Sequence, residues 1–340
     1  MLDRRTLLIG GGVAGAAALA GAGGCASKEA PIERPPGVPL SAFDKRSTAD
    51  QVLEGIDLRG RTILITGATS GLGYESARAL AARGARILVT GRTLERAREA
   101  CARLGAGCEP LELELEQPGS VVECARAVRA LGVPLDVLMC NAGIMVLGER
   151  REVRGVEQHF AVNHLGHFLL ANLLLDRVVA APQGRVVVVA SSAYKWAPAA
   201  GIEFDNLSGA RDFTPNKAYG QSKLANALFS LELARRLGGT AATSNSVNPG
   251  AVDTSLWRHY PGWQRALLAP FKGFLLKKPA QGAATQCYVA SAPALAGFSG
   301  YYFDNCNPQV PPAQVRDAAL AAKLWATSEE LLKGYLSGTA

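Results

Sequence analysis

A tyrosine and a lysine four residues apart are the strongest candidates for chemistry in this sequence. Tyr219 and Lys223 stand in the segment Y-G-Q-S-K, and on a helix this spacing places both side chains on one face. A free tyrosine has a pKa of about 10 and is therefore a poor acid or base at neutral pH. A nearby ammonium group stabilises the phenolate and lowers that pKa. The pair predicts general acid–base catalysis by Tyr219.

A glycine-rich segment nearer the N-terminus is typical of a nucleotide-binding turn. The segment Thr66-Gly67-Ala68-Thr69-Ser70-Gly71-Leu72-Gly73 follows an apolar run and precedes a helix-forming stretch. Glycines let the chain turn sharply and let a pyrophosphate approach bare backbone, where N–H groups at a helix N-terminus meet its charge. We therefore expect a phosphate-bearing cofactor at this turn.

Apolar runs and helical patterns alternate from residue 61 onward, and they must position these groups. Predicted strands cover residues 62–65, 86–90, 109–116, 135–140, 185–190 and 243–247. Predicted helices cover residues 74–83, 94–104, 121–131, most of 152–180, and 219–237. Continuous apolar strands separated by helices indicate a parallel sheet covered on both faces. The sequence predicts an α/β protein, a Rossmann-type doubly wound parallel sheet in a single domain.

Three further motifs share a fixed order with the glycine-rich turn and Tyr219–Lys223. They are Asn141-Ala142-Gly143, Ser191-Ser192-Ala193 and Asn248-Pro249-Gly250. With the spacing T-G-x-x-x-G-x-G, this order resembles the short-chain dehydrogenase/reductase family over nearly all of residues 47–335. Residues 160–168, 219–226 and 300–325 look most similar to its retinol dehydrogenase and WW-domain oxidoreductase branch.

The resemblance implies a catalytic tetrad of Asn163, Ser192, Tyr219 and Lys223. In the family, the residue at Ser192 polarises a carbonyl, and the residue at Asn163 holds a proton-relay water near the lysine. Ser191 is the neighbour that could be mistaken for Ser192. The implied reaction moves a hydride between a nicotinamide and an aldehyde, ketone or alcohol, with Tyr219 as the acid or base.

The resemblance also implies a nicotinamide dinucleotide site. Arg92 ends the second strand, where an NAD-specific relative presents an acid to the ribose, so NADP(H) is favoured over NAD because a guanidinium can bind a 2′-phosphate. Glu114 occupies the place of an aspartate that contacts adenine. The implied cofactor-binding residues are Thr66, Gly67, Ser70, Gly71, Leu72, Gly73, Arg92, Glu114, Leu115, Asn141, Ala142, Gly143, Tyr219, Lys223, Pro249, Gly250, Val252 and Thr254.

The expected substrate is a small apolar carbonyl compound or alcohol. Aromatic residues of two long loops are expected to line or cover its pocket: Trp196, Phe204, Phe213, Trp257, Tyr260 and Trp263. Two alternatives stay open. One is a catalytically idle NADP-binding sensor or scaffold, which the intact tetrad disfavours. The other is a light-driven enzyme similar to protochlorophyllide reductase, whose characteristic cysteine is not evident here.

The first 25 residues have the pattern of a signal peptide, with a positive start, an apolar middle and small residues at the end. Arg4 and Arg5 resemble a twin-arginine signal, and Cys25 resembles a lipoprotein acceptor that would anchor the protein to a membrane. Residues 10–15 also match G-x-G-x-x-G, but no second strand or ribose-binding acid follows.

The predicted organisation is therefore a signal at residues 1–25, a linker at 26–45 and a short-chain dehydrogenase/reductase domain at 46–340. The signal predicts export across a bacterial inner membrane to a periplasmic or lipid-anchored location. If the signal is not used, the protein stays in the cytoplasm.

Composition and residue spacing bear on other classes of protein, such as nucleic-acid-binding, metal-binding and disulfide-rich proteins. Hydrophobic residues make up 48% of the 340 residues and charged residues 19%, which indicates a well-buried core. The net charge of +7 is not concentrated in a basic run, so no nucleic-acid partner is expected. His159, His164 and His167 lack neighbouring ligand residues, so no metal is expected. The cysteines after Cys25 show no regular spacing and are expected to be mostly buried thiols. A homo-oligomer is left open.

Overall fold

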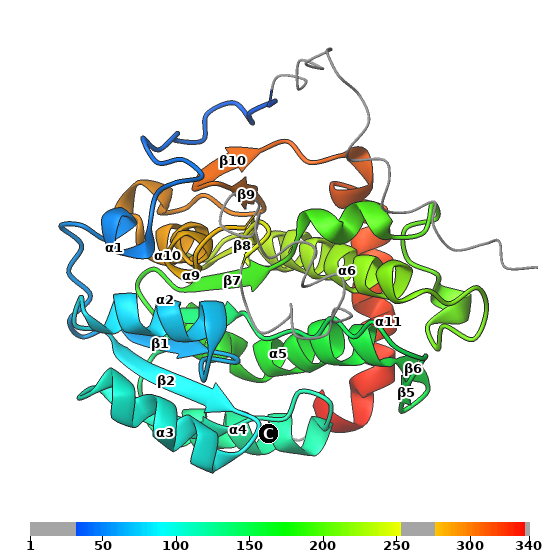
Figure 1. Ribbon diagram of the computed structural model, residues 1–340, viewed down its shortest axis with the longest axis horizontal. Helices are drawn as coiled ribbons and strands as arrows, with labels where there is room; N and C mark the ends of the chain where they lie inside the picture. The colour runs from blue at the N-terminus through cyan, green and yellow to red at the C-terminus, as the bar shows by residue number, and fades with distance from the viewer. Residues whose placement is uncertain (1–31, 253–275, 337–340) are drawn as a thin grey trace, which may run out of the picture. The chain divides into compact units, whose positions relative to one another are not determined.

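The central sheet has eight strands in the order β10-β9-β8-β7-β4-β1-β2-β3 (Figure 1). The computed structural model describes residues 32–252 and 276–336. All neighbouring strands pair in parallel except β9 and β10. The strands are β1 (Thr62–Ile65), β2 (Arg86–Gly91), β3 (Cys108–Glu112), β4 (Val137–Cys140), β7 (Arg185–Val189), β8 (Thr243–Asn248), β9 (Tyr302–Asp304) and β10 (Asn307–Gln309).

Helices cover both faces of this sheet (Figure 1). They are α1 (Ala49–Val52), α2 (Gly71–Ala81), α3 (Leu94–Leu104), α4 (Pro118–Ala130), α5 (Gly166–Val179), α6 (Pro215–Arg236), α9 (Pro279–Gly282), α10 (Ala284–Ser291) and α11 (Ala318–Leu336). Leu64 packs in an apolar cluster with α4, α5, α6 and α11, whereas Ile63 and Ile65 pack with α1, α2, α3 and α10. Alternate strand residues point to opposite faces, so β1 serves both layers. The doubly wound parallel sheet in a single domain is confirmed.

Two element boundaries differ from the prediction in ways that affect the site. Helix α6 begins at Pro215, because Pro215 suits the first helical position and the Thr214 hydroxyl accepts from the Lys217 N–H at 3.2 Å. Tyr219 therefore lies in the second turn and not at the helix start. Strand β3 ends at Glu112, so the alternation of leucines up to residue 116 does not mark pairing. The Leu113 N–H still donates to the Gly91 carbonyl at 2.8 Å.

The segment expected to be mostly helical over 152–180 begins with a hairpin. Strands β5 (Glu152–Val153) and β6 (Val156–Glu157) pair antiparallel, and the turn between them has positive φ at Arg154 and Gly155. A π-helical segment, Phe160–Leu165, then precedes α5. Such segments are rare and often mark functional sites.

Part of the predicted linker packs on the sheet edge. The Ser41 N–H donates to Asn307 Oδ1 at 2.9 Å, and the Ser41 hydroxyl donates to the Cys306 carbonyl at 3.0 Å. The Arg34 guanidinium donates to the Pro308 carbonyl at 2.7 Å. Residues from Arg34 onward belong to the same compact unit as the sheet. The described helices include none that could span a membrane.

The cysteines correct one expectation. Cys101 of α3 and Cys108 of β3 form a disulfide, with Cα atoms 5.3 Å apart. Their separation of seven residues is not a recognised spacing, and the turn that brings them together uses positive φ at Gly105 and Gly107. The four other cysteines of the described chain are buried thiols, as expected: Cys124, Cys140, Cys287 and Cys306.

Candidate functional site

The glycine-rich turn joins β1 to α2 and forms a cradle of backbone. Gly67 has a φ of +66°, which favours glycine. A Cβ atom on Gly73 would lie 2.5 Å from both Asn141 Nδ2 and the Gly67 carbonyl oxygen, so any side chain would close the turn. Ser70 is exposed, and its side chain makes no capping hydrogen bond to α2. The turn fits a pyrophosphate that approaches bare backbone at a helix N-terminus.

Hydrogen bonds join this turn to the end of the neighbouring strand β4. The Thr66 hydroxyl accepts from the N–H groups of Asn141 at 2.8 Å and Ala142 at 2.9 Å. The Asn141 amide donates to the Thr66 carbonyl at 2.8 Å. Gly67 packs so closely on Ala142 that an added Cβ would lie 2.9 Å from the Ala142 Cβ. The predicted N-A-G residues therefore form one unit with the cofactor turn.

The end of β2 packs against the cofactor turn. A Cβ on Gly91 would lie 2.8 Å from Thr69 Cγ2, so this position has no room for a side chain. Arg92 follows and is exposed. The carboxylate of Glu114 accepts from the Glu116 N–H at 3.2 Å. The predicted adenine contact of Glu114 stays a prediction.

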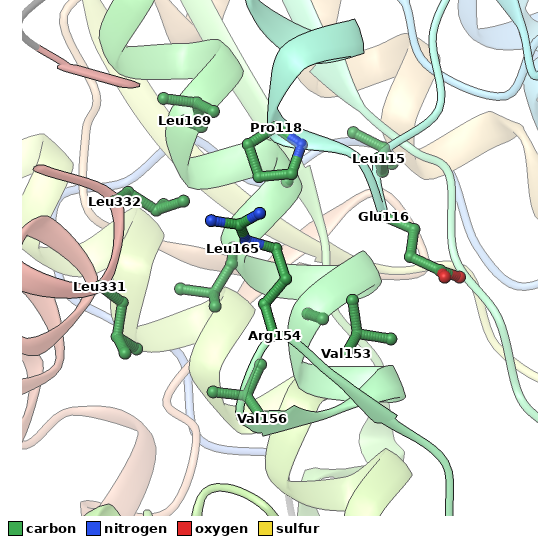
Figure 2. A pocket seen from close by; sticks show the side chains of 12 residues that line it. Leu115, Glu116, Pro118, Val153, Arg154, Val156, Leu165, Leu169, Leu331 and Leu332 are labelled. Carbon is green, nitrogen blue, oxygen red and sulfur yellow. The ribbon is translucent and has the colours of Figure 1, made fainter. Parts of the chain in front are cut away.

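Leu115 lines a pocket that is separate from the tetrad. Its side chain lines a pocket shared by Arg154 of the β5–β6 hairpin, Leu165 before α5, and Leu332 of α11 (Figure 2). No member of the predicted tetrad lines this pocket. A cofactor contact of Leu115 would therefore involve its backbone.

Asn163 and Lys223 both lie beside Gly143. Asn163 Oδ1 accepts from the Ile144 N–H at 2.8 Å, and Asn163 Nδ2 donates to the Ile144 carbonyl at 3.0 Å. The Lys223 ammonium donates to the Val189 carbonyl at the end of β7, at 3.1 Å. A Cβ on Gly143 would lie 3.2 Å from Asn163 Oδ1 and 3.5 Å from Lys223 Nζ, so the missing side chain lets these groups approach.

Tyr219 and Ser192 belong to two segments that pack closely. Lys223 Nζ lies 5.7 Å from the centre of the Tyr219 ring. Gly220 lets α6 contact the turn after β7, because a Cβ there would lie 2.8 Å from the Ala193 carbonyl oxygen. The Ser191 hydroxyl caps this turn by accepting from the Ala193 N–H at 3.1 Å, whereas Ser192 is exposed. Ser192 is thus the better placed of the two serines for a substrate.

The turn after β8 lies next to the turn that carries Ser192. Asn248 Oδ1 accepts from the N–H groups of Ser192 and Gly250, both at 3.2 Å, which ties the turn containing Pro249 to Ser192. Val252 is buried, and a Cβ on Gly282 of α9 would lie 2.6 Å from Val252 Cγ2. Thr254, Trp257, Tyr260 and Trp263 lie outside the described residues.

The expected pocket aromatics within the described residues differ in exposure. Trp196 is 47% exposed, and its ring centre lies 6.4 Å from that of Tyr219. Phe204 and Phe213 are half-buried. Trp196 is the described aromatic side chain with the clearest access to a substrate beside Tyr219.

The three clustered histidines, His159, His164 and His167, are fully buried and hydrogen-bonded. His159 Nε2 accepts from the Val146 N–H at 2.9 Å, while its Nδ1 lies 2.7 Å from the Glu157 carboxylate. His164 lies 2.8 Å from the Ser328 hydroxyl of α11. Burial lowers the pKa of His164 to about 3. The described residues contain no group of side chains suited to hold a metal ion. Glu157 and His159 fix the loop after Gly143, a role that their spacing in the sequence does not reveal.

Comparison with known proteins agrees with this geometry. A family described as short chain dehydrogenase matches residues 61–204. The chain is 40% identical to "Short-chain dehydrogenase TIC 32 B, chloroplastic" of Brassica napus over 304 residues, which cover 86% of this chain and 95% of the relative. The chain belongs to the short-chain dehydrogenase family.

Two further relatives confirm the predicted branch. Retinol dehydrogenase 14 of Homo sapiens is 39% identical and covers 81% of this chain and 87% of its own. The WW domain-containing oxidoreductase of Homo sapiens is 38% identical and covers 86% of this chain and 73% of its own. Among solved structures, the Pseudomonas aeruginosa RhlG/NADP active-site complex is 27% identical, with a TM-score of 0.59 and coverage of 73% of this chain and 95% of the other.

The burial of Lys223 predicts a conflict between stability and function. Burial lowers the pKa of Lys223 to about 8 from 10.5. The unfolded chain therefore binds more protons than the folded chain between these pH values, so this group makes the protein more stable as the pH rises from 8 to 10.5. At pH 7 the charged group costs up to about 3 kcal/mol.

We expect Lys223→Met to raise the free energy of unfolding at pH 7 and to abolish turnover. The Val189 carbonyl keeps a donor, because Asn226 Nδ2 lies 3.1 Å from it. Denaturant unfolding at pH 7 and pH 10 checks this, with exposed Lys195→Met as the control. A variant that is less stable than the wild type at pH 7, or a difference that does not shrink at pH 10, would contradict the account.

Proposed function

We propose that this protein is an NADP(H)-dependent oxidoreductase that interconverts an apolar aldehyde or ketone and the corresponding alcohol. The observation that carries the proposal is that Asn163 and Lys223 both lie against Gly143, next to the backbone cradle of the cofactor turn. Membership of an oxidoreductase family supports the reaction class. The intact tetrad supports an active enzyme over an idle sensor.

The side chains divide the chemistry among them. A bound nicotinamide supplies or accepts the hydride. Tyr219 gives its phenolic proton to the oxygen of the carbonyl substrate during reduction, and it takes the proton back from the alcohol during oxidation. The Ser192 hydroxyl donates a hydrogen bond to the same oxygen. Lys223 stabilises the phenolate of Tyr219, and its burial strengthens that effect because the surroundings screen its charge poorly.

The preference for NADP(H) rests on the end of β2. Gly91 has no room for an acidic side chain, since an added Cβ would already lie 3.1 Å from the Ala97 nitrogen and 3.2 Å from the Thr93 carbonyl oxygen. This chain thus has Gly91 and Arg92, and no acidic side chain, where an NAD-specific relative presents an acid to the ribose. Exposed Arg92 is left to meet a 2′-phosphate. The similar RhlG structure is a complex with NADP, which agrees with this preference.

The apolar substrate is supported by Trp196, which is partly exposed beside Tyr219. Similarity to retinol dehydrogenase 14 is consistent with a substrate of this class.

We also propose that the protein works outside the cytoplasm, anchored through lipidated Cys25. The N-terminal pattern with Arg4 and Arg5 supports export, and the disulfide between Cys101 and Cys108 supports an oxidising compartment, because structural disulfides are rare in the cytosol.

Tyr219→Phe should lower kcat for NADPH-dependent reduction of medium-chain or aromatic aldehydes by at least about 100-fold, because the proton donor is lost. Binding of NADPH should persist and should be visible as a rise in Tm. Tyr288→Phe, which removes the same hydroxyl from a buried tyrosine of α10, is the matched control. Equal kcat values for wild type and Tyr219→Phe would rule out the mechanism.

Arg92→Ala should raise KM for NADPH by about 10- to 100-fold and leave KM for NADH nearly unchanged, because charged hydrogen bonds to the 2′-phosphate are lost. Arg98→Ala removes an exposed arginine from the following helix α3 and serves as the control. The NADP(H) preference is wrong if Arg92→Ala changes both KM values alike.

Fractionation of the native cells followed by mass spectrometry tests the location. We expect membrane-associated protein that begins at diacylglyceryl-Cys25 and keeps the Cys101–Cys108 disulfide. Cytosolic protein that begins at Met1 and has reduced thiols would overturn export.

A further inference from the structure

His167 occupies the space between the cofactor turn and the catalytic asparagine. Its side chain is fully buried at the start of α5. Nδ1 lies 2.9 Å from the backbone carbonyl oxygen of Asn163, and Nε2 lies 2.8 Å from the Thr66 hydroxyl. One imidazole ring thus bridges the π-helical segment and the end of β1.

The hydrogen-bond partners allow only one tautomer. A carbonyl oxygen can only accept, so His167 Nδ1 carries the proton and Nε2 is left as an acceptor. The Thr66 hydroxyl therefore donates its hydrogen to Nε2. Both lone pairs of that hydroxyl then remain for the N–H groups of Asn141 and Ala142. A proton on Nε2 would leave the Thr66 hydroxyl with three donors and only two lone pairs.

We propose that His167 is a positioning residue that holds the cofactor turn and the catalytic asparagine in register. Through Nε2 it orients the Thr66 hydroxyl and so the backbone of Asn141 and Ala142. Through Nδ1 it holds the carbonyl of Asn163, whose side chain fixes Ile144 beside Lys223. We call these two hydrogen bonds, between Nε2 and Thr66 and between Nδ1 and Asn163, the two arms of His167. Loss of either arm would let the cofactor turn and Asn163 move apart, although both must act on one cofactor.

The neutral state of His167 is maintained by its surroundings. Burial is the main reason that the pKa of His167 falls to about 4; the charge of Lys223 contributes to this shift, and the hydrogen bond to the Asn163 carbonyl opposes it. The weaker alternative for the Thr66 hydroxyl is the Met139 carbonyl at 3.4 Å. If the hydroxyl hydrogen turned there, His167 Nε2 would lose its hydrogen-bond donor.

Two substitutions separate the arms. His167→Asn keeps a donor near the Nδ1 position and loses Nε2, whereas His167→Gln keeps an acceptor near Nε2 and loses the Nδ1 donor. His164→Gln is the matched control, because His164 is equally buried and faces Ser328 of α11 instead.

Amide hydrogen exchange in the cofactor-free protein measures the effect of each arm on the backbone and does not require enzymatic activity. We expect His167→Asn to speed exchange at Asn141 and Ala142 by at least about tenfold, and His167→Gln to do so at Ile144. His164→Gln should leave all three amides within about twofold of wild type. Unchanged exchange at these amides in both folded His167 variants would overturn the proposal.

If the His167 variants fail to fold, a measurement on the wild-type protein still tests the proposal. Nitrogen-15 NMR of the His167 ring should show the neutral Nδ1–H tautomer, with no second ring proton down to pH 5. An Nε2–H tautomer, or protonation above pH 6, would also overturn the proposal.

The kinetic consequence rests on the proposed function. We expect each His167 variant to lose at least about tenfold in kcat/KM, with His167→Asn acting mainly on KM for NADPH and His167→Gln mainly on kcat. An active wild type whose kcat and KM for NADPH survive both substitutions would contradict the inference alone. A wild type that neither binds NADPH nor reduces aldehydes would contradict the proposed function, and the exchange data would still decide the role of His167.

Discussion

The ammonium group of Lys223 is buried at the edge of the sheet where the parallel strands end, and it donates to the Val189 carbonyl at 3.1 Å. Removing a charge from water is costly, and the lowered pKa of Lys223 reflects that cost. The same burial leaves the charge poorly screened, and the ammonium nitrogen lies 5.7 Å from the centre of the Tyr219 ring. The surrounding structure must therefore supply stability elsewhere, and the two apolar clusters on the faces of the sheet do so.

Glycines at three contacts let the residues of the predicted tetrad and the cofactor turn pack closely around this ammonium group. Gly73 lets the cofactor turn contact Asn141, Gly143 lets Asn163 approach Lys223, and Gly220 brings α6 against the turn that carries Ser192. An added Cβ would meet backbone atoms at Gly73 and Gly220, which move less readily than the end of a flexible side chain. The site is thus fixed by backbone contacts between elements that are far apart in the sequence.

The sequence predicted the parallel sheet and the order of its motifs, because apolar runs and glycine spacing are local signals. The placement of Asn163 and Lys223 beside Gly143 could be inferred only through family resemblance, since it depends on the space at Gly143. The hairpin at Arg154, the early start of α6 and the disulfide between Cys101 and Cys108 were missed. Each depends on a turn conformation or a capping residue that periodicity does not encode. Thr254 lies outside the described residues, so its predicted contact stays a prediction.

Transfer of deuterium from cofactor to product tests the central claim most directly. The protein would be incubated with NADPH deuterated at C4 of the nicotinamide on either face, together with a medium-chain aldehyde such as decanal. The account predicts that one of the two labelled cofactors gives an alcohol with a single deuterium on the former carbonyl carbon. Unlabelled alcohol from both cofactors, or no alcohol from any apolar aldehyde while NADPH is bound, would contradict it.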